Sequence, residues 1–540
     1  MLGACFIALI VLSPLLVLAI LALNGRTDHW AHLFTYVLPN AAGNTALLLF
    51  GVGVLVACLG TGAAWLVTAY TFASRNVLRW ALLLPLAVPT YIVAFAYLDL
   101  LHPLGPVQGL IRNMLGYASP REFRLPDLRG LGGAIFLLGF VLYPYVYLST
   151  RVMFATQAAS LLEAGRSLGL SGKGVFFRVA LPLARPAIAV GLSLALLETL
   201  NDIGASEFLG VQTLTVSVYT TWITRSDLGG AAQIALAMLT LVVGLIAIER
   251  YGRRHQRYTP TQRLRPIQPR RLEGLAALVA ITLGWLPVLI GFAAPALYLL
   301  VEAVTHFQQS GGVSSHLLAS LFNTLQLAGS ATVAVVACGV VVIWASRIQS
   351  SGSPRNLCRL ASRAAALGYA IPGTVLAIGL LTPLVMVDGF LSRLAAMFGM
   401  NLTGLVIMGS SAGLVCAYTI RFLAISSGSL ESGLMRIPPS LEQASRLLGE
   451  TATTTLRRVH WPLLRPAVGA AALLVFVDAM KELPTTLLLR PVNFDTLATW
   501  LYAEAARGTY EEGAIAALAI VLAGLLPVIL LARNQLNAAH

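Results

Sequence analysis

The sequence predicts an all-α protein that crosses a membrane about twelve times, in two homologous halves of six helices. Three observations support this fold class: the composition, the spacing of the apolar segments and an internal repeat. The chain has 540 residues, of which 57% are hydrophobic and 11% are charged, whereas about 25% of the residues in a soluble domain are charged. A protein with so few charges is expected to present most of its surface to lipid.

The apolar segments have the length of membrane spans, which need about 20 residues each. The first segment has no basic residues before it and is longer than the apolar part of a signal peptide, so we expect an uncleaved helix. Asp478, Lys481 and Glu482 interrupt the eleventh segment. The twelve segments lie near residues 2–23, 44–70, 78–98, 131–149, 183–201, 229–248, 274–301, 322–346, 364–387, 404–420, 466–480 and 513–532.

The loop charges orient these spans. With the N-terminus in the cytoplasm, 26 of the 36 Lys and Arg residues fall on the cytoplasmic side, including the stretch from Arg421 to Arg465. Cytoplasmic loops carry such an excess of Lys and Arg, so both termini are expected in the cytoplasm. The net charge of +14 comes with few interleaved exposed aromatics, and we therefore expect lipid and no nucleic acid as a partner.

An internal repeat relates the two halves at an offset of 280 residues. The segment from Arg178 to Ile188 matches the segment from Arg458 to Val468 at seven of eleven positions, and Asn44-Thr45 matches Asn323-Thr324 after a small shift. The repeat indicates two domains of equal membrane orientation, as in a fusion of two homologous subunits. We assign residues 1–250 and 274–540 to the two domains, and residues 251–273 to a basic cytoplasmic linker.

A short motif occurs once in each half, between the fourth and fifth spans. It reads Glu163-Ala-Gly-Arg-Ser-Leu-Gly169 in the first half and Glu442-Gln-Ala-Ser-Arg-Leu-Leu-Gly449 in the second, each followed thirteen residues later by Leu-Pro or Trp-Pro. The apolar residues share one helical face, namely Leu161, Ala164 and Leu168, and Leu441, Ala444 and Leu448. Each glycine is expected to end its helix. A short cytoplasmic helix joined to two spans can transmit a movement from a soluble partner into the membrane.

These two motifs resemble the Glu-Ala-Ala loop of bacterial binding-protein-dependent ABC importer permeases. The resemblance covers nearly the whole chain and implies a type I ABC importer permease fold in the bacterial inner membrane. It also implies a periplasmic substrate-binding protein and two copies of an ABC ATPase that dock on the loops. Gly165 and Ser445 depart from the family by replacing its third alanine, and Gln443 stands at its glutamate. The docking residues that the resemblance implies are Glu163, Ala164, Gly165, Gly169, Glu442, Gln443, Ala444, Ser445 and Gly449.

Within that family, three segments are similar to the fused permeases of ferric iron importers. They are Leu200-Asn-Asp-Ile-Gly-Ala205, Met480-Lys-Glu-Leu-Pro-Thr-Thr486 and Arg490-Pro-Val-Asn-Phe-Asp-Thr-Leu497. Ferric iron is therefore the expected substrate. Fused permeases for thiamine share much of this plan, and thiamine or another small solute is the alternative.

A group of charged residues lies at the outer end of the fifth span of each half. Ionisable groups at that depth usually face a bundle interior or a water-filled cavity. We expect an acidic vestibule that receives a cation, since ferric iron favours oxygen ligands. The alternative is that Lys481 pairs with a neighbouring carboxylate and that these residues only tie helices together. The candidates are Glu198, Asp202, Asp478, Lys481 and Glu482.

Several functions are excluded or disfavoured by what the sequence lacks. No G-x-x-x-x-G-K-[ST] loop occurs, so this chain is not expected to be an enzyme or to bind a cofactor. ATP and magnesium are expected on the partner ATPase. The five cysteines are scattered and are interpreted as packing residues, and no metal ligand set is assigned. A secondary transporter driven by an ion gradient also fits twelve spans in two parallel halves.

Overall fold

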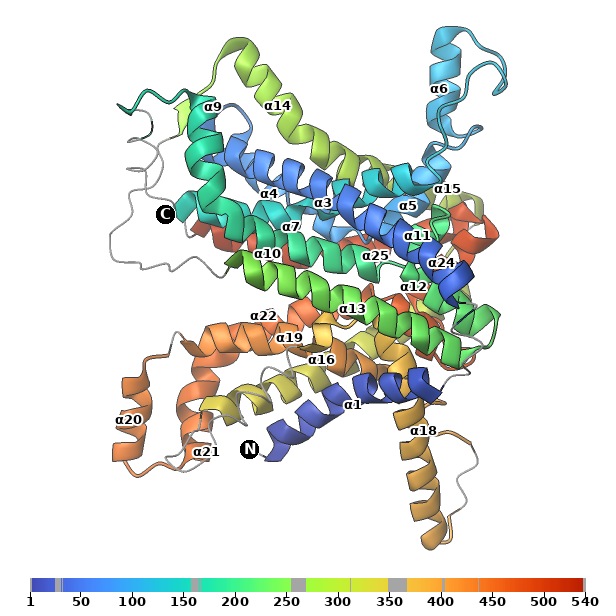
Figure 1. Ribbon diagram of the computed structural model, residues 1–540, viewed down its shortest axis with the longest axis vertical. Coiled ribbons are helices and arrows are strands. Elements are labelled where there is room, and N and C mark those ends of the chain that lie inside the picture. Colours follow the sequence, from blue (N-terminus) through green and yellow to red (C-terminus); the bar gives the residue numbers. More distant parts are fainter. Residues whose placement is uncertain are drawn as a thin grey trace. The chain divides into compact units, whose positions relative to one another are not determined.

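The computed structural model describes most of the chain (Figure 1). The described residues are 2–24, 31, 33–156, 165, 167–253, 269–310, 312–347, 367–400, 404–435 and 437–537. The chain packs into two compact units, each built from three segments. Unit 1 comprises Met1–Val37, Ser217–Leu239 and Val313–Tyr502, and unit 2 comprises Leu38–Val216, Thr240–Gly312 and Ala503–His540.

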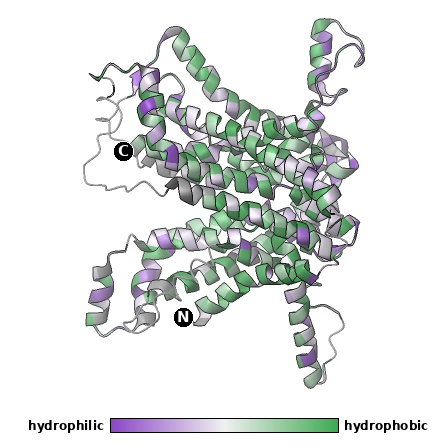
Figure 2. Cartoon of the chain, in the orientation of Figure 1, coloured by the Kyte–Doolittle hydropathy of each residue, from purple (hydrophilic) through white to green (hydrophobic). Residues whose placement is uncertain are grey.

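The predicted all-α fold is confirmed. Among the described residues, eleven helices are long and apolar enough to cross a membrane, and one bent pair, Arg75–Ala87 with Thr90–Leu100, brings the number of spans to twelve. Each predicted segment overlaps one of these spans, including the eleventh, which the structure places at Leu456–Met480. Hydrophobic residues run along the long helices of both units (Figure 2).

Unit 2 contains most spans of the first half together with spans from the second half. Its principal helices are α3 (Leu38–Ala69), α4 (Arg75–Ala81), α5 (Thr90–Leu100), α6 (Pro106–Leu115), α7 (Leu131–Thr156), α9 (Gly172–Val175), α10 (Leu181–Asn201), α11 (Gly204–Phe208), α14 (Gly274–Val288), α15 (Ala294–Ser310) and α25 (Tyr510–Asn537). Helix α3 packs along α7 and α10, and α25 packs on α15 and α5. Two strands, β1 (Tyr70–Thr71) and β2 (Arg270–Arg271), form a short parallel pair that attaches the end of the predicted linker to α3.

Unit 1 contains most spans of the second half together with the first helix of the chain. Its principal helices are α1 (Leu2–Asn24), α16 (Ser315–Arg347), α18 (Gly373–Met397), α19 (Ser411–Met435), α20 (Pro439–Leu447), α21 (Ala452–Thr455), α22 (Trp461–Met480) and α23 (Pro484–Leu489). Helix α1 packs on α18 and α16 (Figure 1). Helices α12 (Leu214–Tyr219), α13 (Leu228–Arg253) and α24 (Leu497–Arg507) contribute residues to both units. The compact units therefore do not coincide with the sequence repeats, because α1 lies in unit 1 whereas α14, α15 and α25 lie in unit 2.

Small residues allow the helices of unit 2 to approach closely, as the Gly-rich and Ala-rich spans predict. A Cβ atom on Gly60 of α3 would lie 2.7 Å from Val146 Cβ, and one on Gly191 of α10 would lie 2.6 Å from Val146 Cα. Both glycines are needed because α7 packs against each of these helices at backbone contact distance. Such contacts stabilise helix association in lipid, where the hydrophobic effect between helices is absent.

The fifth span of each half starts earlier than predicted. The predicted spans begin near residues 183 and 466, but a π-helical turn already precedes Pro182 and Pro462, at η3 (Phe176–Ala180) and η7 (Leu456–His460). Proline has no N–H to donate within a helix, and a π-turn is a common way to absorb such an irregularity. The spans therefore continue without a break from Gly172 and from Leu456.

Candidate functional site

The second motif forms a short helix that is fixed to the start of the following span. Helix α20 carries Ser445, whose Oγ lies 2.8 Å from Thr455 Oγ1 in a buried hydrogen bond. On the same side, Glu442 Oε1 lies 3.1 Å from His460 Nε2. The carboxylate of Glu442 thus faces the chain, while Gln443 and Ala444 are exposed.

Both motifs end in the same way, as the sequence predicts. Gly169 and Gly449 have left-handed backbones, with φ of +83° and +79°. The residue after each glycine donates its N–H to a carbonyl five residues back, Leu170 to Gly165 and Glu450 to Ser445, both at 3.1 Å. This is the long-range bond of a Schellman helix end, which favours glycine at the left-handed position.

The two departures from the family's third alanine are each matched by their surroundings. Gly165 is buried, and a Cβ atom there would lie 3.4 Å from Val179 Cγ2 and 3.8 Å from Val175 Cγ2. Thr455 takes the place of Val175 at the 280-residue offset, and its hydroxyl binds Ser445. The third position therefore packs inward in both motifs. Glu163 and Ala164, and with them the predicted face of Leu161 and Ala164, lie outside the described residues.

The described residues of the apolar face are exposed in both motifs. In the second motif Leu441, Ala444 and Leu448 are exposed, and the side chain of Leu448 is 82% accessible. Leu168 of the first motif is 83% accessible. Exposed leucines on a well-anchored turn are typical of a surface that another protein covers.

The loop after α20 is held by a charge pair. Arg458 Nη1 lies 2.6 Å from Glu450 Oε1. The hydroxyl of Thr454 and the Arg458 guanidinium hold the pKa of Glu450 below its usual range. Both groups favour the ionised carboxylate.

Asp202 lies buried at the end of α10, where it caps the next helix. Its Oδ1 accepts hydrogen bonds from Ala205 N at 3.2 Å and from Thr90 Oγ1 at 3.3 Å. Within the described residues, Asp202 Oδ2 has no hydrogen-bond partner. The side chain therefore ties α10, α11 and α5 together.

Glu482 occupies the equivalent place in the second repeat and has the same capping role. Its Oε1 accepts hydrogen bonds from Thr485 N at 3.2 Å and from Thr485 Oγ1 at 2.7 Å. Its Oε2 lies 3.1 Å from Nε of Arg421, and both side chains are buried. Asp202 and Glu482, which are 280 residues apart, thus make corresponding contacts.

The sequence prediction was wrong for Arg421, which we assigned to a cytoplasmic loop. The structure places it in the middle of α19, a span of 25 residues from Ser411 to Met435. An arginine inside a span is costly unless it is paired, and Glu482 supplies the pair. Val141 stands at the corresponding position of the first half, so Asp202 has no such arginine. An extension of the tenth apolar segment through Arg421 would have revealed this residue.

The remaining candidates of the predicted vestibule are partly accessible. Lys481 Nζ lies 2.8 Å from Asp478 Oδ1, the pairing that the alternative interpretation expects. Glu198 is half-buried on α10. The part of the chain that the structure describes holds no group of three or more His, Cys, Asp or Glu residues placed to bind a metal ion.

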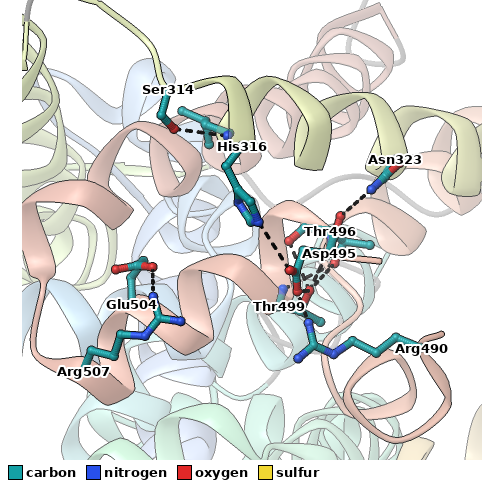
Figure 3. Close-up of polar contacts among 10 residues, drawn as sticks. Ser314, His316, Asn323, Arg490, Asp495, Thr496, Thr499, Glu504 and Arg507 are labelled. Carbon is teal, nitrogen blue, oxygen red and sulfur yellow. Dashed lines mark hydrogen bonds and ion pairs between the residues drawn. The ribbon is translucent and has the colours of Figure 1, made fainter. Parts of the chain in front are cut away.

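The segment that resembles ferric iron permeases, Arg490 to Leu497, has a structural role (Figure 3). Arg490 pairs with the carboxylate of Asp495, and His316 Nε2 lies 3.6 Å from Asp495 Oδ2. The Asp495 carbonyl accepts a hydrogen bond from Asn323 Nδ2 at 3.0 Å. These contacts fix the start of α24 on α16 and leave Asp495 engaged within the fold.

The same anchor exists in the first repeat. Asn44 Nδ2 donates to the carbonyl of Gln212 at 3.2 Å, as Asn323 does to Asp495. The repeated Asn-Thr pairs of the sequence therefore make repeated long-range contacts. Sequence reasoning identified the pairs but not their partners.

Comparison with known proteins agrees with this geometry. Residues 51–257 match the family model for the binding-protein-dependent transport system inner membrane component. The chain is 24% identical to the Fe(3+)-transport system permease protein FbpB 2 of Haemophilus influenzae, over 94% of this chain and 92% of that protein. It is 24% identical to a probable ABC transporter permease, y4fN, of Sinorhizobium fredii, over 92% and 87% of the two chains.

A shorter relative matches part of the chain. The molybdenum transport system permease protein ModB of Escherichia coli is 29% identical over 35% of this chain and 86% of its own length. Fold, repeated loops and relatives agree, and the chain belongs to the family of inner-membrane components of binding-protein-dependent transport systems.

Proposed function

We propose that this ABC importer permease carries ferric iron into the cytoplasm. The single observation that supports this substrate most strongly is the similarity to an Fe(3+) permease over nearly the full length of both chains. Permeases named for molybdenum and 2-aminoethylphosphonate match shorter parts of the chain. Thiamine or another small solute therefore remains the alternative substrate.

In this proposal a periplasmic binding protein delivers the iron, and two copies of a separate ATPase bind ATP and magnesium. The ATPase subunits dock on the exposed leucines of the two motifs, with both chain termini in the cytoplasm. Closure of the ATPase pair would favour one of two global states of the permease, since a partner shifts an equilibrium only through contacts that differ between the states. The rigid attachment of α20 through Ser445 and Glu442 supports this transmission.

In this proposal the carboxylates that a passing cation meets are Glu198 and Asp478, the latter paired with Lys481. Asp202 and Glu482 cap helices, so we assign them a positioning role beside the pathway. Replacement of Glu198 by Gln and of Asp478 by Asn should slow transport without impairing assembly. Unchanged transport by the double variant would refute an acidic vestibule.

The experiment that tests the substrate is ATP-dependent uptake in proteoliposomes. The purified permease is combined with the ATPase and binding protein encoded beside it, and ferric iron, thiamine and molybdate are compared. Iron uptake that requires all three components is expected. Uptake of a different solute would change the substrate, and uptake by this chain alone under an ion gradient would replace the importer mechanism by secondary transport.

A further inference from the structure

We propose that α6 and the outer half of α18, which carries Met386 and Phe390, anchor the protein at the membrane surface. Both lie at the boundary between the lipid headgroups and the acyl chains. This boundary is on the membrane side opposite the coupling motifs, the name used from here for the two short motifs at Glu163–Gly169 and Glu442–Gly449. The connectivity fixes that side. Helix α7 runs from the end near α6 to the end that leads into the first motif, and α19 likewise separates α18 from α20.

The polarity of α6 is reversed relative to a helix on a soluble protein. A surface helix normally buries its apolar face and presents its polar face to water. In α6 the buried side chains are Gln108 and Arg112, which are 2% and 7% accessible. Leu110 and Met114 are 59% and 78% accessible. This arrangement is stable where the surroundings of the helix are apolar.

The buried polar side chains of α6 make hydrogen bonds to the protein backbone. Gln108 donates to the carbonyl of Leu101 at 2.7 Å and accepts the N–H of Leu125 at 3.1 Å, while Arg112 donates to the carbonyl of Pro103 at 2.7 Å. The bond to Leu125 holds the loop between α6 and α7, here called the return loop, against the buried face of α6. Their burial is thus satisfied, and the exposed apolar face needs a different partner.

The second repeat carries the same device at the 280-residue offset. Asp388 stands at the position of Gln108 and is 1% accessible. Its carboxylate accepts the N–H groups of Val406, Ile407 and Met408 at 2.7 to 3.0 Å, which closes the second return loop. Met386 and Phe390, next to Asp388 on α18, are exposed. Two copies of one arrangement indicate a shared environment.

The length and direction of these helices favour a position along the membrane surface. Helix α6 has ten residues, about 15 Å at 1.5 Å per residue, which is too short to cross the bilayer core. It runs across the direction of α3 and α7, and α18 runs across the direction of α16 (Figure 1). Met386 and Phe390 belong to α18, whose composition over Gly373–Met397 is that of a membrane span.

The return loop after α6 has the composition expected at the headgroup level. Its exposed residues include Arg121, Glu122, Arg124, Asp127 and Arg129. Helices with one apolar and one charged side lie along the membrane surface with the apolar side in the acyl boundary. Here the helix supplies the apolar side and the loop supplies the charged side.

Spin labels measure this placement directly. In a variant without the five cysteines, single cysteines replace Leu110, Met114 or Phe390, and a nitroxide is attached. The labelled permease is reconstituted alone in vesicles of phosphatidylethanolamine and phosphatidylglycerol. Collision rates are then measured with oxygen, which enters lipid, and with a water-soluble nickel complex. Controls carry the label at Glu122 on the return loop or at Leu448 on α20.

The three test positions should show an oxygen-to-nickel collision ratio several-fold higher than the two controls. Equal ratios at test and control positions would overturn the proposal. Nickel access at Leu110 and Met114 that is lost on addition of the binding protein would also overturn it, since a protein would then cover this face. The outcome is independent of the transported substrate.

Discussion

The hydroxyl of Thr45 accepts a hydrogen bond from the backbone N–H of Leu214 at 2.9 Å, across 169 residues of chain. Thr324 accepts the N–H of Leu497 in the same way at 2.8 Å. Each threonine thus satisfies the first N–H of a short helix, α12 or α24, from the second span of its own repeat.

Replacement of Thr45 or Thr324 by Val should destabilise the protein. Valine keeps the shape but leaves a buried N–H without an acceptor, which costs about 1–3 kcal/mol. Thermal unfolding of the purified variants in detergent measures the effect. Thr332→Val is the matched control, because the Thr332 hydroxyl donates to the carbonyl of Ala328, one turn back in its own helix. Equal losses in all three variants would contradict the anchoring role.

Replacement of one partner of the buried pair Arg421 and Glu482 should destabilise the protein more than replacement of both partners by uncharged residues. Arg421→Met leaves an unpaired buried carboxylate, and the loss of one partner of such a pair costs about 3–5 kcal/mol. Addition of Glu482→Gln to Arg421→Met removes the buried charge and keeps an oxygen that can accept hydrogen bonds from Thr485. The double variant should unfold at a higher temperature than Arg421→Met alone. A double variant that is as unstable as the single one would show that the pair contributes through packing.

Leu448→Asp and Leu168→Asp should abolish binding of the ATPase while leaving the permease folded. Both side chains are exposed in the chain itself, so a charge there costs little until a partner covers it. Co-purification of the ATPase and unfolding of the permease alone separate the two effects. Val492→Asp is the control, since Val492 is 90% accessible but follows α23 rather than a coupling motif. Loss of ATPase binding in the control as well would argue against a local docking surface.

An apolar contact, as at the equivalent positions Gly165 and Val175 of the first motif, should be able to replace the hydrogen bond between Ser445 and Thr455. Ser445→Ala alone leaves the Thr455 hydroxyl buried without its partner, at a cost of about 1–3 kcal/mol. Ser445→Ala with Thr455→Val should restore most of that loss, because both polar groups are then removed. Hydrogen exchange of the α20 amides reports on the stability of this attachment. Faster exchange in the double variant than in Ser445→Ala would contradict the interpretation.

The sequence by itself determined the membrane spans, the repeat and the helix ends at Gly169 and Gly449. These features are local: a span is an apolar run of sufficient length, and a left-handed helix end favours glycine. The Asn-Thr pairs and the capping carboxylates Asp202 and Glu482 could also be matched between repeats, because equivalent positions keep equivalent residues. Their hydrogen-bond and ion-pair partners could not be predicted, because each partner lies in another span or at a turn whose geometry depends on the fold.

Only the tertiary structure decided which spans pack together. It placed α1 with α16 and α18, and α14, α15 and α25 with the spans of the first half. Hydropathy cannot predict this, because lipid is as apolar as leucine, and helices in a membrane select their neighbours through close packing and hydrogen bonds. The same reason explains Arg421. Its charge resembled a loop signal in the sequence, and only the position of Glu482 on another element makes its burial in α19 favourable.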